Sequence, residues 1–128
     1  MPEVRIGAGW SDRRWKEALQ KLTSSQKLVI ENSLRGLLAA LLECRDPLLD
    51  SALQAWNPSR WAVPYKRDAY GTWIEFRLGD DDNRARAIVC YDRKAGVIYL
   101  VARTAIHDHR ALNELVTSFS PPRKPPRG

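Results

Sequence analysis

The chain has 128 residues, a length that suits one domain with a single core. Its formal net charge of +6 favours an anionic partner such as nucleic acid, an acidic protein or a membrane surface. The longest apolar run, GLLAALL at 36–42, is too short for a transmembrane helix of about 20 residues, and the first ten residues lack a signal-peptide core. Cys44 and Cys90 are far apart, so we expect two buried free thiols in a reduced, cytoplasmic protein.

The N-terminal half predicts a short strand followed by two helices. Residues 3–7 (EVRIG) fit the strand, and Ser11 can cap the first helix. Thr23 and Gln26 match the capping box that opens the second helix, which is expected to end before Pro47. The apolar side of the first helix comprises Trp15, Ala18, Leu19 and Leu22; that of the second comprises Val29 or Ile30, Leu34, Leu37, Leu38, Leu41 and Leu42. We expect these helices to form a hairpin.

The C-terminal half predicts three antiparallel strands and a helix. An irregular segment at 57–71 precedes the strands, which alternate in polarity over 70–78, 84–92 and 97–106 and are separated by the turns GDDDN and RKAG. Apolar residues then recur at helical spacing from Arg110, with Asp108 placed to cap the helix. The basic, proline-rich residues 120–128 are expected to be a disordered tail.

Alternation along these strands predicts one apolar face and one arginine-rich face. Ile74, Phe76 and Leu78 belong to the apolar face. The opposite face is expected to carry Arg77, Arg84, Arg86, Tyr99, Arg103 and, if the last strand continues, His107. Arginines beside aromatic rings suit phosphates and bases, but a solvated face with cross-strand pairs such as Arg86 with Glu75 fits the pattern equally well.

The segment at 72–108 resembles the second half of the RelE/ParE/HigB toxin superfamily. Arg77 in WIEFR and Arg86 in ARAIVCY stand where that family has arginines, and His107 with Asp108 matches a family variant. Residues 13–37 resemble the family's helical hairpin, whereas residues 50–71 are more elaborate than its usual loop. The resemblance implies a single α+β domain over 1–119, with a helical hairpin packed on a small antiparallel sheet and a short C-terminal helix.

The resemblance also implies the toxin of a type II toxin–antitoxin system. Most such proteins are endoribonucleases that need no metal ion or cofactor, cleave mRNA on the ribosome and bind an acidic antitoxin; no membrane partner is expected. The candidate catalytic residues are His107, Arg86, Asp108 and His109. Histidine can act as base or acid near neutral pH, arginine can hold the phosphate, and Asp108 can orient a histidine. The candidate RNA-binding residues are Arg77, Arg84, Arg103, Lys66, Arg67 and Tyr99.

Simpler interpretations accompany each of these residues. Asp108 can serve only as a helix cap, with His109 pointing to solvent from the first helical turn, and Lys66 with Arg67 can be a solvated pair. The spacing of the two histidines is a weak zinc pattern, with no third ligand evident nearby. A ParE-like inhibitor of DNA gyrase and a non-catalytic module that binds RNA or protein are the alternative functions, because a fold does not determine its activity.

Overall fold

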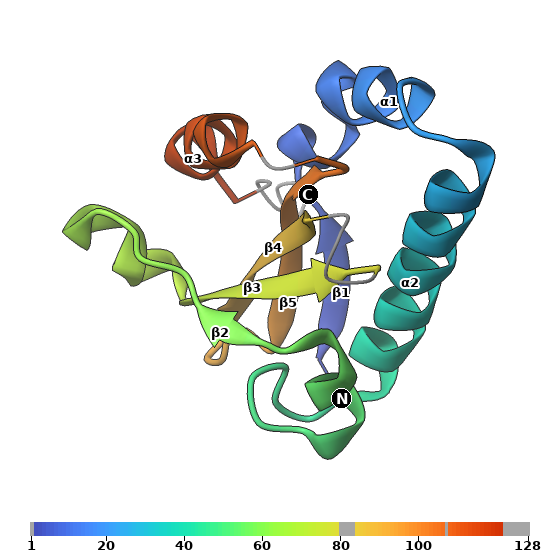
Figure 1. Cartoon of the computed structure of the whole chain (residues 1–128). Helices are drawn as coiled ribbons and strands as arrows, with labels where there is room; N and C mark the ends of the chain where they lie inside the picture. The colour runs from blue at the N-terminus through green and yellow to red at the C-terminus, as the bar shows by residue number, and fades with distance from the viewer. Residues whose placement is uncertain (1, 80–83, 107, 122–128) are drawn as a thin grey trace, which may run out of the picture.

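The structure is a computed structural model that describes residues 2–79, 84–106 and 108–121. One five-stranded sheet lies at its centre, in the order β1-β5-β4-β3-β2 (Figure 1). The antiparallel meander predicted from the alternating pattern is confirmed as β3 (Thr72–Leu78), β4 (Ala85–Asp92) and β5 (Val97–Thr104). The sheet is nevertheless mixed, because β1 (Glu3–Ile6) pairs with β5 in parallel and the two-residue β2 (Ser59–Arg60) extends the β3 edge.

Within the described residues, three α-helices accompany the sheet: α1 (Arg13–Gln20), α2 (Ser24–Glu43) and α3 (His109–Ser118). The predicted capping box is confirmed, since Gln26 N–H donates to Thr23 Oγ1 and Thr23 N–H donates to Gln26 Oε1. The predicted cap of the first helix was wrong by one residue. Ser11 belongs to the 3₁₀ helix η1 (Ala8–Ser11), and Asp12 accepts the N–H of Arg14 instead.

The α2 helix covers one face of the sheet (Figure 1). The residues that it buries are spaced by four and three positions and are Ile30, Leu34, Leu37 and Leu41. They pack with Ile74, Phe76 and Leu78 of β3 in one core. Burial of Ile30 settles the choice between it and Val29, while Leu42, which was expected on the apolar side, is 56% exposed.

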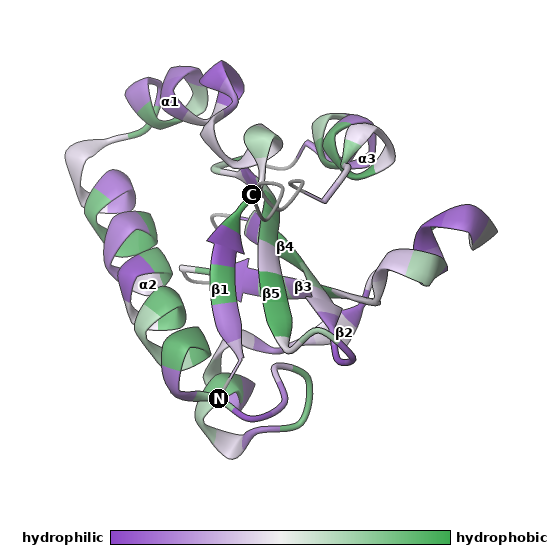
Figure 2. Ribbon diagram, turned by 180° about the vertical axis from the view of Figure 1, so that it is seen from behind, coloured by the Kyte–Doolittle hydropathy of each residue, from purple (hydrophilic) through white to green (hydrophobic). Residues whose placement is uncertain are grey.

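The other face of the sheet is covered as well, which corrects the expectation of an open arginine-rich face. α3 and the segment that contains the 3₁₀ helix η3 (Tyr65–Tyr70) lie over it (Figure 1). The second core consists of Trp73, Ile88, Cys90, Val97, Tyr99, Val101, Ala102, Leu112, Val116 and Phe119. The central strands are accordingly hydrophobic over much of their length (Figure 2).

A β-bulge in β5 reverses the orientation of the residues at the end of that strand. Val89 pairs with Leu100 and Ile88 pairs with Ala102, so Val101 is an extra residue between two register pairs. Beyond it, Arg103 stands opposite Ala87 on the face of the first core, and Thr104 stands opposite Arg86. Simple alternation, which placed Arg103 beside Arg86, was therefore wrong.

Arg103 instead joins the sheet to the N-terminal segment. Its guanidinium carbon lies 4.9 Å from the ring centroid of Trp10 and 4.6 Å from that of Trp15. Its Nε donates to the Trp10 carbonyl over 2.8 Å. These contacts compensate for burial, which lowers the pKa of the guanidinium from its ordinary value.

The two cysteines are free and buried, as the sequence predicted. Burial raises the pKa of the Cys44 thiol to about 11 and that of Cys90 to about 12. Both thiols are therefore held in the unreactive protonated form near neutral pH. No helix among the residues that the structure describes is long and apolar enough to span a membrane.

Replacing Arg103 with alanine is expected to reduce the free energy of unfolding by about 2 kcal/mol, because it removes two cation–π contacts and a hydrogen bond. Urea unfolding of both proteins measures the difference. Arg13→Ala is the control, since that side chain is 89% exposed, and it should change stability by less than about 0.5 kcal/mol. Equal losses for the two variants would contradict the structural role of Arg103.

Candidate functional site

A cleft of about 120 Å³ lies where α3 begins beside β3, β4 and β5. It is lined by Glu75, Arg84, Arg86, Thr104, Asp108, His109 and Leu112. The fold thus brings together four of the residues that the sequence singled out: Arg84, Arg86, Asp108 and His109. Cations, a carboxylate and an imidazole that meet in one concave site provide groups for binding a phosphate and for moving protons.

Two arginines lie side by side near the rim of the cleft. Arg77 on β3 is directly opposite Arg86 on β4, and like charges at such a position destabilise a sheet by about 0.2–1 kcal/mol. Glu75 offsets part of this repulsion, because its Oε1 lies 3.7 Å from Arg86 Nε. Arg84 precedes β4 in an exposed position and adds a further positive charge. This end of the sheet has an excess of positive charge that suits an anion.

Asp108 caps α3, as the sequence predicted. Its Oδ1 accepts the N–H of Ala111 over 2.9 Å. The N-terminus of a helix carries partial positive charge, so the start of α3 adds to the anion-attracting character of the cleft.

His109, the first residue of α3, is exposed but stacks on an aromatic ring. Its imidazole lies 4.8 Å from the Trp61 ring, centroid to centroid, with 39° between the planes. His109 is therefore exposed, as the simpler interpretation has it, but its ring also contacts an indole. The side chain lines the cleft with one face supported by an indole.

Two of the other candidates lie away from the cleft. Tyr99 is 6% exposed and packs against Phe119, so it offers no ring on which a base can stack. Arg103 lines a neighbouring cavity of about 160 Å³ with residues of α1. These positions conflict with the candidate roles of both residues in binding RNA. The alternating pattern could not predict them, because it reveals neither the helix that covers Tyr99 nor the bulge that turns Arg103.

The remaining candidates lie outside the cleft or outside the described residues. Arg67 donates to the Phe119 carbonyl and lies 5.5 Å from the Tyr70 ring centroid, so its guanidinium supports the second core. Lys66 is an exposed residue of η3 and does not line the cleft. His107 falls outside the described residues. Among those described, no three His, Cys, Asp or Glu side chains are grouped in a way that could hold a metal ion.

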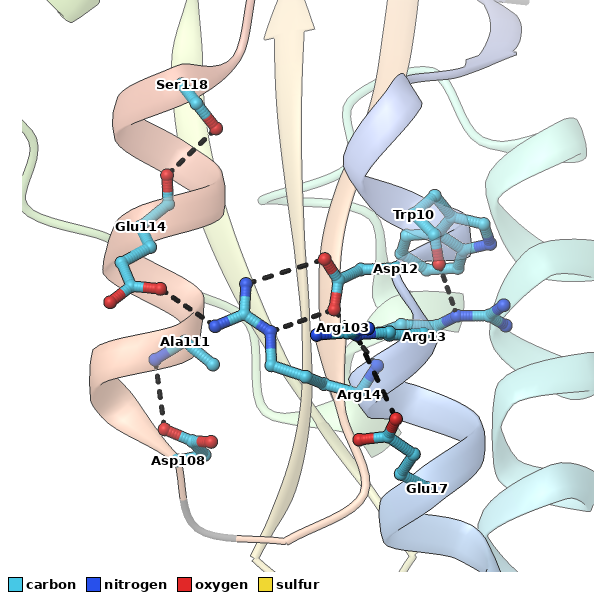
Figure 3. Close-up of polar contacts among 10 residues, drawn as sticks. All are labelled: Trp10, Asp12, Arg13, Arg14, Glu17, Arg103, Asp108, Ala111, Glu114 and Ser118. Carbon is cyan, nitrogen blue, oxygen red and sulfur yellow. Dashed lines mark hydrogen bonds and ion pairs between the residues drawn. The ribbon is translucent and has the colours of Figure 1, made fainter.

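An ion-pair network joins the middle of α3 to the start of α1 (Figure 3). Arg14 Nη1 lies 2.8 Å from Glu114 Oε2 of α3, and Arg14 Nε lies 2.8 Å from Asp12 Oδ1 at the start of α1. Hydrogen bonds from Arg14 lower the pKa of both carboxyl groups below their ordinary values. The network steadies the helix that contributes Asp108 and His109 to the cleft.

The sequence analysis did not identify Thr104 or Trp61 as residues of this site. It named Glu75 only as a surface partner of Arg86, whereas Glu75 also lines the cleft. The alternating pattern does place Glu75 on the correct face. Thr104 reaches the cleft only because of the bulge, where its buried hydroxyl donates to the Ile106 carbonyl over 2.6 Å. No local pattern marks Trp61, because β3, β4 and β5 separate it from His109 in the sequence.

Comparisons with known proteins return one similar fold and no family assignment. No family model matches the chain, and no curated protein matches it. The chain is similar to a RelE toxin. The solved structure is that of the isolated E. coli RelE toxin; the match covers 91% of this chain and 97% of that chain, with 13% sequence identity and a TM-score of 0.41.

Arg14→Gln should weaken the dependence of stability on acidic pH. A carboxyl with a lowered pKa stabilises the native state above its ordinary pKa, which is 3.8 for Asp12 and 4.5 for Glu114. This stabilisation is lost as the pH falls through the lowered values. Urea midpoints measured from about pH 6 to about pH 2 should therefore fall less steeply in the variant than in the wild type.

Arg93→Gln is the control for this experiment, because it also removes one positive charge from an ion pair. Arg93 pairs with Asp46 at a distance of 2.9 Å, away from α3. The control should keep the steep decline of the wild type. A decline in Arg14→Gln as steep as that of the wild type would contradict the assignment of these shifts to Arg14.

Proposed function

We propose that the chain is a RelE-like toxin of a type II toxin–antitoxin system that acts in the cytoplasm as an endoribonuclease on ribosome-bound mRNA, without a metal ion. The observation that carries this proposal is the cleft that unites Arg84, Arg86, Asp108 and His109. Its residue types are those needed to bind a phosphodiester and to transfer protons. The resemblance of the strand sequences to those of the RelE superfamily supports the same function.

The proposed reaction is an attack by the ribose on its own phosphodiester. A base removes the proton of the 2′-hydroxyl, the 2′-oxygen forms a bond to phosphorus, and the bond from phosphorus to the 5′-oxygen breaks as an acid protonates that oxygen. Arg86 and Arg84 bind the phosphate and stabilise the negative charge that develops on it. His109 and His107 are the candidates for base and acid, with the Glu75 carboxylate next to Arg86 as a further proton acceptor.

The RNA strand is proposed to cross the exposed basic end of the sheet. Arg77 and Arg84 are exposed there, and Lys66 is exposed on η3 as a further candidate contact. Arg67, Arg103 and Tyr99 already make intramolecular contacts, so they are assigned no RNA contact. The net charge of +6 also suits an acidic antitoxin as the partner that blocks the toxin.

Arg86→Ala, His109→Ala and His107→Ala should each reduce mRNA cleavage in a translating bacterial extract by about 100-fold or more. Each change removes a phosphate ligand or a candidate proton-transfer group. Mapping the ends of one mRNA measures the loss. Arg93→Ala, which removes a positive charge far from the cleft, should cut like the wild type.

The alternative functions predict different results in the same extract. Intact mRNA with normal translation in the presence of the wild type would contradict the nuclease proposal. Inhibition of purified gyrase by that same preparation would then identify a ParE-like activity. Cleavage that persists in all three variants would show that other residues carry the activity.

Arg77→Thr is expected to stabilise the fold and weaken RNA binding at the same time. Removing one of two opposed arginines should raise the free energy of unfolding by about 0.2–1 kcal/mol. Losing one phosphate contact should reduce the slope of log affinity against log salt by about 0.7 for single-stranded RNA. Urea unfolding and fluorescence anisotropy at several salt concentrations measure the two effects. A variant that loses stability but keeps the full salt slope would contradict this role of Arg77.

A further inference from the structure

We propose that Trp61 is a positioning residue that holds the imidazole of His109 in the cleft. This inference rests on the proposed function, in which His109 takes part in proton transfer. It assigns a role to the segment at 57–71, the part of the chain that departs most from the sequence pattern of the RelE superfamily. That segment brings an aromatic wall to the start of α3.

The backbone of Trp61 is fixed to the sheet. Just before it, Ser59 and Arg60 of β2 pair with Glu75 and Ile74 of β3. The N–H of Trp61 then donates to the carbonyl of Trp73 over 3.0 Å. The indole therefore projects from an anchored point on the β3 edge, beside the strand that supplies Glu75 to the cleft.

The segment that follows Trp61 is also held at its far end. Trp73 Nε1 donates to the carbonyl of Arg67 over 2.9 Å, and Arg67 donates to the carbonyl of Phe119, which follows α3. The same segment thus touches the sheet, the end of α3 through Arg67 and the start of α3 through Trp61. A wall attached in this way stays in place when a ligand enters the cleft.

The polar atom of the indole does not explain its position. Trp61 Nε1 is buried and, among the described residues, has no hydrogen-bond partner. A buried N–H without a partner is unfavourable by about 1–3 kcal/mol. Trp61 must therefore be stabilised by the contacts of its rings, and the stack on His109 is one of these.

The stack limits where the His109 imidazole can go. His109 is the exposed first residue of α3. The charged groups that share its cleft are Glu75 of β3, Arg84 just before β4, Arg86 of β4 and Asp108, the cap of α3. With one ring face on the indole, the imidazole keeps its nitrogen atoms near the position where Arg86 would hold a phosphate. Displacement of a catalytic group by about 1 Å can reduce a rate by about 100-fold.

The test uses two substitutions at Trp61 and a control at another tryptophan. Trp61→Leu removes the aromatic wall, whereas Trp61→Phe keeps a ring and removes the N–H without a partner. Trp56→Leu is the matched control, because Trp56 donates to Ser33 and packs on α2, on the opposite side of the sheet. All three variants are expected to fold, which circular dichroism and urea unfolding verify before the other measurements.

The first measurement is the proton resonance of the His109 imidazole, assigned by its disappearance in His109→Gln. The indole ring current should shift this resonance upfield in the wild type. Trp61→Leu should move it downfield toward the position of an exposed histidine, whereas Trp61→Phe and Trp56→Leu should move it little. An unchanged resonance in Trp61→Leu would overturn the proposal, whatever the activity.

The second measurement is single-turnover cleavage of the mRNA substrate. Trp61→Leu should reduce the maximal rate about 10-fold to 100-fold with little change in the half-saturating RNA concentration. Trp61→Phe should restore most of the rate, and Trp56→Leu should match the wild type. Wild-type rates in Trp61→Leu would overturn the positioning role even if the resonance shifts.

The two measurements separate this proposal from the proposed function. One outcome is that the wild type does not cleave RNA although the His109 resonance depends on Trp61. This result would refute the nuclease function and the catalytic role of Trp61, but it would confirm the contact between the two rings. Cleavage that needs His109 but ignores Trp61 would refute the positioning role and leave the nuclease intact.

Discussion

The extra residue Val101 in β5 determines which side chains reach the cleft. In a regular strand, Arg103 would share a face with Val101 and Tyr99. The bulge turns Arg103 toward Trp10 and Trp15, where it fastens the sheet to the N-terminal segment. The same shift places Thr104 opposite Arg86, at the end of the strand that leads to α3. Bulges often re-aim side chains beside functional sites, and this one serves the core and the cleft together.

Coverage of both sheet faces concentrates the polar chemistry at one end. α2 buries one face, while α3 and the segment at 61–70 bury the other. Arg77 of β3, Arg86 of β4 and Arg84 just before β4 therefore stand where the apolar covering ends. α3 begins at the same place, so its helix terminus, its capping aspartate and His109 face the arginines. The Arg14 network then ties α3 to α1 and stabilises this arrangement.

Local patterns in the sequence were sufficient to predict the elements and several of their ends. The alternation at 72–104, the box formed by Thr23 and Gln26, and the Asp108 cap depend on residues close together in the chain. Arg84, Arg86, Asp108 and His109 were selected from the same short stretches, and the fold brings them together. The nuclease activity stays a proposal.

Features that depend on distant parts of the chain could not be predicted in this way. A bulge has no reliable sequence signal here, so Arg103 was placed on the wrong face. The covering of Tyr99 by Phe119, and the stack of Trp61 on His109, join segments separated by many residues. Each of these contacts is decided by packing in three dimensions, for which alternation and helical spacing carry no information.

The central claim, that the cleft beside the start of α3 binds RNA, is tested most directly by nuclear magnetic resonance. Backbone amide resonances would be followed while a short RNA is added, with a 2′-O-methyl group on each ribose to prevent cleavage. The account predicts that the largest shifts fall at Arg84, Arg86 and Thr104 and at Asp108 through Leu112, and that they weaken with added salt. Shifts confined to the outer face of α2, around Leu28 and Leu42, or no shifts at all, would contradict it.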